Sequence, residues 1–283
     1  MPERFGEIKQ RLLKLAEAGS DIKAIIEIGS QTREQTPADQ FSDLDLILAT
    51  SEPERYLCGD ELISRLGSPL ISFVEPTLAG AKERRILFEG SLDVDIVVVT
   101  PGQLSRAIGA GELGGILARG SRVLFDRMGA AESLKFAPAP IPGGPMSLQE
   151  YTNTVNDFWF HIVWAAKKLR RGELYTAVAC VNGYISSLLL AMIVLCEKCR
   201  HSMYYDVWHN GRLLELWAGE DVREGLRGCF TPYDSLETAE TLRALANLYS
   251  RLARASAEAL RYPYPEKAEQ SALKILNNLL ENQ

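Results

Sequence analysis

Residues 41 to 48 read Phe-Ser-Asp-Leu-Asp-Leu-Ile-Leu, an acidic pair that runs into an apolar segment. The apolar end predicts a buried β-strand. Side chains alternate between the two faces of a strand, so Asp43 and Asp45 leave the same face with their Cα atoms about 6.5 Å apart. Two carboxylates this close on an apolar strand repel each other unless a cation compensates them. The spacing therefore predicts that one divalent cation can reach both.

A second acidic strand offers a third carboxylate. Residues 92 to 99 read Leu-Asp-Val-Asp-Ile-Val-Val-Val, which places Asp93 and Asp95 on one face of another buried strand. Carboxylate oxygens are the ligands that Mg²⁺ prefers, and waters and substrate phosphates usually complete its coordination. The two strands together indicate metal-assisted phosphoryl or nucleotidyl transfer.

An Asp-x-Asp pair alone is common in proteins that bind no metal, so the interpretation depends on its context. Gly29-Ser30 follows the apolar run Ala24-Ile-Ile-Glu-Ile28, and a polar loop from Gln31 to Gln40 then leads to the acid pair. A glycine at the end of a strand lets backbone amides approach a phosphate. In this order, strand, Gly-Ser turn, acid pair and later acidic strand, the chain resembles the nucleotidyltransferase core of the DNA polymerase beta superfamily.

Composition narrows the class of substrate. The 283 residues include 31 Lys plus Arg and 37 Asp plus Glu, a net charge of −6. This charge disfavours nucleic acid and suits a small cationic substrate. Five scattered cysteines form no disulfide framework, the charged N-terminus has no signal peptide, and the apolar run from Ile185 to Leu195 is too short to span a membrane. A cytoplasmic protein without a membrane partner is expected, and no particular oligomeric state is predicted.

Two domains are expected. Apolar spacing and turn residues predict an α/β unit with these elements: a helix over 3–18 ending near Gly19, a helix over 56–66, a strand over 70–74, a hairpin of 85–88 with 92–99 across Gly90-Ser91, helices near 102–118, and a strand over 122–125. Residues 135–146 are rich in proline and glycine and predict a linker.

The second half is predicted to be helical. Ser147-Leu-Gln-Glu150 has the spacing of a capping box at the start of a long helix. Helical patterns then continue to the end of the chain, with breaks at Gly172, Gly211 and Pro232. The predicted domains are thus an α/β domain with a mixed β-sheet at 1–140 and an all-α helical bundle at 147–283.

The first helix of the second half makes the resemblance more specific. It carries Asn156-Asp-Phe-Trp-Phe-His161 and then Ala166-Lys-Lys-Leu-Arg-Arg-Gly-Glu173. With the Gly-Ser turn and the Asp-x-Asp strand, this arrangement resembles the aminoglycoside 6-adenylyltransferases, the streptomycin adenylyltransferase family. Further matching segments are Gly67 to Pro76, Gly120 to Asp126 and Tyr264-Pro265, so the resemblance covers nearly the whole chain. Gln31 and Arg33 depart from the family pattern, which commonly has Arg and Asn there.

The resemblance implies an N-terminal nucleotidyltransferase domain that transfers AMP from MgATP to a hydroxyl of an aminoglycoside, streptomycin-type at the 6-position, and releases pyrophosphate. Asp43 and Asp45 would hold Mg²⁺. Asp95 would complete the metal site beside the attacking hydroxyl, while Asp93 would lie outside it. Gly29 and Ser30 would bind the terminal phosphates of ATP.

The C-terminal helical domain would bind both nucleotide and acceptor. Lys167 and Arg171 share a helix face and match the family where its members bind the triphosphate, although solvated surface cations are the alternative interpretation. Acids such as Glu173, Asp206 and Glu215 could bind the ammonium groups of an aminoglycoside. Glu173 is preferred because it follows the family pattern.

Other features are interpreted as structural. Cys196-Glu-Lys-Cys199 with His201 lacks the second cysteine pair of a zinc site. The aromatic residues Trp159, Phe160 and Trp164 suggest packing, although one of them could line a substrate cleft. Two other functions stay open: a nucleotidyltransferase for another hydroxyl compound, such as a lincosamide or a metabolite, and an inactive nucleotide-binding regulator. The three retained acids disfavour the regulator, because a protein without a metal has no use for adjacent buried carboxylates.

Overall fold

The computed structural model describes residues 4–33, 36–77, 80–117, 119–135, 144 and 146–281. The chain divides into two compact units, residues 1–141 and 142–283. The linker predicted at 135–146 lies mostly outside the described residues. Each unit is described by itself.

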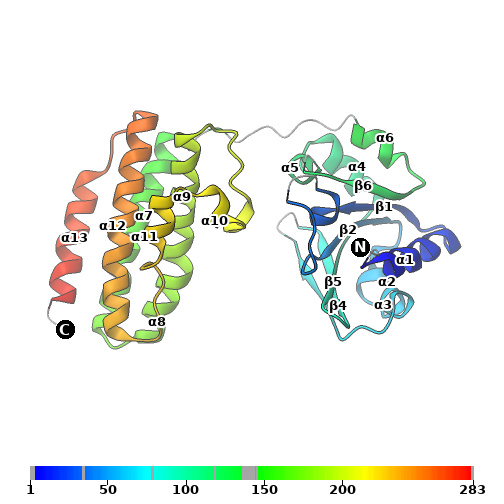
Figure 1. Ribbon diagram of the computed structural model, residues 1–283, viewed down its shortest axis with the longest axis horizontal. Coiled ribbons are helices and arrows are strands. Elements are labelled where there is room, and N and C mark those ends of the chain that lie inside the picture. Colours follow the sequence, from blue (N-terminus) through cyan, green and yellow to red (C-terminus); the bar gives the residue numbers. More distant parts are fainter. Residues whose placement is uncertain are drawn as a thin grey trace. The chain divides into compact units, whose positions relative to one another are not determined.

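A six-stranded sheet forms the centre of the first unit in the part of the chain that the structure describes (Figure 1). Its order is β3-β4-β5-β2-β1-β6, and β2 and β5 are parallel while the other neighbours are antiparallel. The sheet is therefore mixed, as predicted. The strands are β1 Ile22–Ile28, β2 Leu44–Thr50, β3 Ile71–Pro76, β4 Lys82–Phe88, β5 Leu92–Val99 and β6 Arg122–Asp126.

Helices pack on both faces of this sheet. They are α1 Gly6–Ala18, the 3₁₀ turn η1 Gly29–Thr32, α2 Pro53–Leu57, α3 Glu61–Leu66, α4 Pro101–Gly109, α5 Gly114–Leu117 and α6 Ala130–Lys135. Apolar side chains of α1, α2 and α3 form one core cluster with alternate residues of β2 and β5, such as Leu46 and Ile96. Helices α4 and α6 cover the other face, where Leu104 and Ile108 pack against Ile26 and Ile47. Alternation along β1, β2 and β5 thus supplies both cores.

The hairpin prediction is confirmed, because β4 and β5 pair with Phe88 opposite Leu92, across a turn in which Gly90 and Ser91 have positive φ. The prediction of one helix over 56–66 is wrong. Two short helices, α2 and α3, occupy the segment, and the bond from Cys58 N to the Glu54 carbonyl closes the first of them. Gly59 follows directly, and glycine is a poor helix former in a helix interior.

Helices, four of them 15 residues or longer, form the described part of the second unit. They are α7 Leu148–Arg170, α8 Leu174–Ala179, the π-helical η2 Cys180–Ile185, α9 Ser186–Arg200, η3 His209–Gly211, α10 Leu214–Trp217, α11 Glu220–Leu226, α12 Ser235–Leu260 and α13 Glu266–Leu280. The capping box is confirmed: the Ser147 hydroxyl accepts from the Glu150 amide, and the Glu150 carboxylate accepts from the Ser147 amide. Breaks fall near Gly172, Gly211 and Pro232, as predicted.

Aromatic residues of α7 form part of the core of this unit. Phe158 stacks on Tyr249 of α12 with ring centroids 3.5 Å apart, and the Trp159 indole donates to the Tyr264 hydroxyl at 3.2 Å. Phe160 faces the other way and is 62% exposed. Core packing is confirmed for Trp159, whereas Phe160 is not part of the core of this unit.

One helix is longer than its sequence suggests. Segments α8, η2 and α9 run on as a 27-residue helix, Leu174–Arg200, which is long and apolar enough to cross a membrane by length and composition. The estimate based on Ile185 to Leu195 was therefore too short. Val181, Leu189 and Met192 are buried among the other helices of the unit, and 39% of the apolar window of this helix is buried.

Candidate active site

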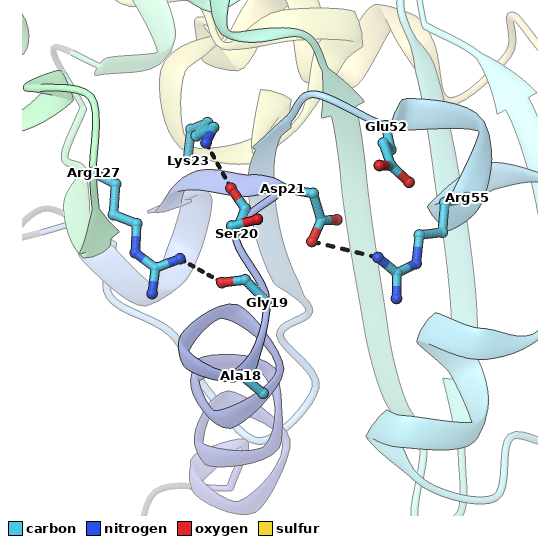
Figure 2. Close-up of a pocket in the computed structure, with 8 residues that line it drawn as sticks. All are labelled: Ala18, Gly19, Ser20, Asp21, Lys23, Glu52, Arg55 and Arg127. Atoms are coloured by element: carbon cyan, nitrogen blue, oxygen red, sulfur yellow. Dashed lines mark hydrogen bonds and ion pairs between the residues drawn. The ribbon is translucent and has the colours of Figure 1, made fainter.

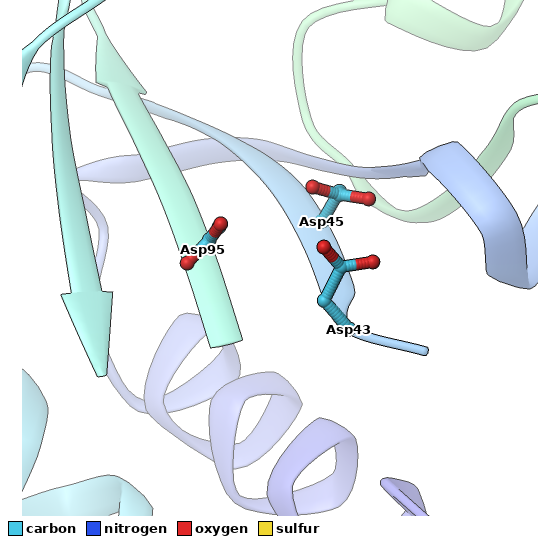
Figure 3. Close-up of side chains that lie close together, drawn as sticks. All are labelled: Asp43, Asp45 and Asp95. Atoms are coloured by element: carbon cyan, nitrogen blue, oxygen red, sulfur yellow. The ribbon is translucent and has the colours of Figure 1, made fainter. Parts of the chain in front are cut away.

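Three carboxylates converge on one face of the sheet in the first unit (Figure 3). Asp45 in β2 lies directly opposite Asp95 in the parallel neighbour β5, and Asp43 immediately precedes β2. One oxygen from each carboxylate lies within 4.8 Å of the other two. Asp95 is buried, and Asp43 and Asp45 are half-buried. The structure thus brings together the three acids that the sequence singled out, while Asp93 is exposed and outside this group.

The charge of this group is only partly balanced. Burial, followed by the charges of Asp43 and Asp95, raises the pKa of Asp45 to about 7, and the charge of Arg33 lowers it in part. Ionisation of a carboxyl group is unfavourable when it is buried beside two others, and a bound cation would offset that cost. Hard oxygen donors at this separation fit a divalent cation such as Mg²⁺, which would favour the ionised form of Asp45.

Gly29 leaves room for the Asp45 carboxylate. Its φ is +75°, and a Cβ atom built on it would lie 2.0 Å from Asp45 Oδ2. The position therefore requires glycine both for its left-handed backbone and for the close approach of the acid.

The residues that follow Gly29 fasten this turn to the acid pair. Ser30 is buried, with its hydroxyl 3.5 Å from the Asp43 carbonyl, and the Gln31 side-chain amide donates to the same carbonyl at 3.0 Å. Thr32 closes the turn by donating from its hydroxyl to the Gly29 carbonyl at 3.0 Å. Gln31 therefore positions the backbone that carries Asp43, which gives its departure from the family pattern a local structural role. A phosphate contact for Gly29 and Ser30 stays a prediction.

Arg85 is a site residue that the sequence interpretation missed. It lies opposite Asp95 across the β4-β5 hairpin, and its guanidinium donates from Nε to Asp95 Oδ1 at 3.0 Å and from Nη2 to Oδ2 at 2.5 Å. Glu83, two residues earlier on the same strand, has its pKa raised by burial and by the charge of Asp95. A two-residue turn at Gly90-Ser91 would have placed Ile86 opposite Asp95. The observed connection has three residues, 89–91, and this shift by one residue is what places Arg85 there.

The predicted nucleotide and acceptor residues of the helical unit are at the end of α7. Lys167 is exposed. Glu173 bridges two cations, with Oε2 2.7 Å from Lys168 Nζ and Oε1 2.8 Å from Arg171 Nε, and the bond from Lys168 lowers its pKa. Asp206 and Glu215 are exposed. The roles of Lys167, Arg171 and Glu173 stay predictions.

The Cys196 segment has a structural environment. Cys196 is buried, and the His201 ring stacks on Tyr205 with centroids 4.1 Å apart. Over the described ranges of the chain, the metal-binding geometry found among His, Cys, Asp and Glu side chains is that of the three aspartates.

A cavity of about 660 Å³ lies at the other end of β1, where most of its charged side chains already have partners (Figure 2). Lys23 donates to the Ser20 carbonyl at 2.6 Å, Arg127 donates to the Gly19 carbonyl at 2.5 Å, and Arg55 lies 3.4 Å from Asp21. These contacts fasten the end of α1 to the strands and leave the acidic site as the place where chemistry is expected. The lining residues are Ala18, Gly19, Ser20, Asp21, Lys23, Glu52, Arg55 and Arg127.

Comparison with known protein families agrees with the chemistry that the three aspartates indicate. The model of the streptomycin adenylyltransferase family matches residues 4–279, almost the full length of the chain. The chain belongs to the streptomycin adenylyltransferase family. Membership accounts for the shared order of the Gly-Ser turn, the two acidic strands and the helical second half.

Individual relatives are distant. The aminoglycoside 6-adenylyltransferase of Bacillus subtilis (strain 168) is 20% identical over 250 residues, which is 85% of this chain and 86% of the relative. Among solved structures, an aminoglycoside 6-adenyltransferase from Bacillus subtilis covers 99% of both chains at 17% identity with a TM-score of 0.46. A nucleotidyltransferase-like protein from Exiguobacterium sibiricum 255-15 has 15% identity and a TM-score of 0.36, with 97% of this chain and 90% of that one covered.

Proposed function

We propose that this protein catalyses the Mg²⁺-dependent transfer of AMP from ATP to a hydroxyl group of an aminoglycoside, with release of pyrophosphate. The observation that carries the proposal is the convergence of Asp43, Asp45 and Asp95 within 4.8 Å, in a chain that belongs to the streptomycin adenylyltransferase family. The distant relative named as an aminoglycoside 6-adenylyltransferase supports streptomycin-type 6-O transfer as the first reaction to test.

The proposed roles follow from the position of each residue. Asp43 and Asp45 would hold Mg²⁺, with Asp95 completing the donor set. When bound, the metal supplies charge that stabilises the phosphates of ATP and the negative charge that develops at the α-phosphorus. Asp95 is proposed to take the proton of the acceptor hydroxyl as the oxygen attacks. Gly29 and the buried hydroxyl of Ser30 are proposed to contact the terminal phosphates.

The helical unit is proposed to complete binding. Lys167 would pair with the triphosphate as a point charge, with Arg171 beside it, and Glu173 would exchange its present cations for an ammonium group of the acceptor. An acidic chain with net charge −6 favours a polycationic acceptor over a neutral one. The five free cysteines support a reducing, cytoplasmic setting.

An acceptor screen tests the proposal. Purified protein, ATP and Mg²⁺ are incubated with streptomycin, with other aminoglycosides, and with a neutral lincosamide, and pyrophosphate release is followed beside the mass of each acceptor. We expect streptomycin to gain one AMP, with a KM that rises with salt, because exposed charges are screened over about 8 Å at physiological ionic strength. Transfer to the lincosamide alone, independent of salt, would overturn the aminoglycoside assignment. No pyrophosphate release with any acceptor would overturn the enzyme assignment.

A further inference from the structure

A protein cation already holds the buried acid of the candidate metal site. Arg85 binds Asp95 through two parallel bonds, Nε to Oδ1 at 3.0 Å and Nη2 to Oδ2 at 2.5 Å. Two charge-assisted bonds in this fork arrangement are a strong and geometrically specific way to hold a carboxylate. Both Asp95 oxygens are therefore engaged by the guanidinium.

A second carboxylate holds the other side of the same guanidinium. Arg85 Nη1 lies 3.2 Å from Glu75 Oε1 on the neighbouring edge strand β3. The Asp95 side chain is 7% exposed, whereas the side chains of Arg85 and Glu75 are 42% and 40% exposed. Arg85 thus bridges a buried acid and an exposed one, and its contact with Glu75 uses a different nitrogen from its contacts with Asp95.

A divalent cation at the three aspartates would compete with this bond. Any cation that binds an Asp95 oxygen shares that oxygen with a guanidinium already bound to it, and two positive charges on one carboxylate repel each other. Without the cation, the guanidinium stabilises the site instead of opposing a bound metal. It compensates one of three carboxylates that lie within 4.8 Å of one another.

We propose that Arg85 and the divalent cation are alternative partners of Asp95. Arg85 holds the acid when the cation is absent, and it releases Asp95 and stays with Glu75 when the cation binds. Arg85 is in this account a positioning residue that keeps the metal-free site intact and weakens metal binding in the absence of nucleotide. The inference rests on the metal site of the proposed function.

Titration with Mn²⁺ in place of Mg²⁺ tests this competition. Free Mn²⁺ is counted by electron paramagnetic resonance, without nucleotide, for the wild type, Arg85→Gln and Arg85→Lys. If the guanidinium occupies Asp95 in about nine molecules of ten, its removal raises the apparent affinity about tenfold. We expect Arg85→Gln to bind Mn²⁺ about tenfold more tightly than the wild type, with Arg85→Lys between them because lysine keeps the charge without the fork. A residue that only holds Asp95 in place would give the opposite change.

Lys82→Gln is the matched control. Lys82 begins the same strand, its substitution removes the same charge, and its partner is the exposed Glu54 at 3.5 Å rather than a site acid. We expect its Mn²⁺ affinity to stay within about twofold of the wild type, since removal of one distant exposed charge is largely screened. If Lys82→Gln and Arg85→Gln gained Mn²⁺ affinity equally, the loss of one positive charge would explain the effect, and the proposal would be overturned.

Failure of the competition and failure of the metal site give different results when Mn²⁺ binding is also measured with ATP. Asp45→Asn serves as the reference for Mn²⁺ bound outside the site. In the first case, the wild type binds more Mn²⁺ than Asp45→Asn when ATP is present. Without ATP, however, Arg85→Gln binds Mn²⁺ no more tightly than the wild type does. The competition is then overturned and the proposed metal site stands. If neither the wild type nor Arg85→Gln exceeds Asp45→Asn under any condition, the metal site itself is overturned. Circular dichroism of each variant verifies that the fold is retained.

Discussion

Asp45 is the acid of the site whose pKa is raised by burial and by its acidic neighbours. Its backbone is fixed by strand pairs on both sides, with Ile28 of β1 and Asp95 of β5. Its carboxylate is confined by the turn at Gly29. The side chain therefore cannot leave its acidic neighbours, and proton uptake is the way it relieves their repulsion when no cation is bound.

This raised pKa predicts how stability changes with pH. The pKa of Asp45 is about 7 in the fold and 3.8 for an ordinary aspartate, so between these values the folded chain binds more protons than the unfolded one. The free energy of unfolding should therefore fall as pH rises from about 4 through 7. Without metal at pH 8, Asp45→Asn should be more stable than the wild type by about 1 to 3 kcal/mol, because the amide carries no charge to repel the neighbouring carboxylates.

Urea unfolding of both proteins at pH 5 and pH 8, with and without Mg²⁺, measures this difference. Saturating Mg²⁺ should reduce it by stabilising the wild type. Curves that stay parallel across the pH range would show that Asp45 ionises normally in the fold.

Gly29 allows a second prediction at the scale of one residue. Gly29→Ala should lower turnover by about 10²-fold or more, because a displaced Asp45 misplaces the site by an ångström or more. Gly129→Ala is the control, since Gly129 has φ +78° and open space where its Cβ would lie. Both variants should lose about 1 to 2 kcal/mol of stability through the left-handed backbone. Equal turnover in the two variants would contradict the close approach of Asp45.

Single elements show what local sequence can predict. Alternation and the Gly90-Ser91 turn predicted the β4-β5 hairpin, and its register places Arg85 opposite Asp95. The break between α2 and α3 was missed although Gly59, a poor helix former, stands at that point of the sequence. The length of the helix Leu174–Arg200 was missed because only its most apolar run was counted. The two acidic strands were recognisable separately. That β2 and β5 are parallel neighbours is a property of the whole sheet, which no local pattern specifies.

The start of α7 allows a prediction at the scale of one helix. Ser147→Ala removes the capping bond to the Glu150 amide and should cost about 1 kcal/mol of stability in urea unfolding. Thr152→Ala, on the same helix, removes an exposed hydroxyl that bonds only the Leu148 carbonyl, and should be neutral or slightly stabilising. A loss in Thr152→Ala as large as that in Ser147→Ala would contradict a specific role for the cap.

The proposed function assigns ATP binding to residues of both units. The acids belong to the first unit and Lys167 to the second. If Lys167 binds the triphosphate, Lys167→Ala should raise the KM for ATP several-fold with a smaller effect on the KM for the acceptor, and Lys167→Arg should restore it only in part. Lys267→Ala, another exposed lysine of the helical unit, should leave both constants unchanged. Unaltered ATP kinetics in Lys167→Ala would make Lys167 an ordinary surface cation.

The most direct measurement compares two acids of one strand. Transfer of label from [α-³²P]ATP to the acceptor is timed for the wild type, Asp95→Asn and Asp93→Asn, with calorimetry of MgATP binding beside it. Asp95→Asn keeps the shape of the side chain but cannot take the proton of the hydroxyl, a step worth about 10² to 10⁴ in rate. The account predicts a loss of at least this size in Asp95→Asn with MgATP still bound, and near wild-type transfer in Asp93→Asn. Near wild-type transfer in Asp95→Asn, or an equal loss in both variants, would contradict it.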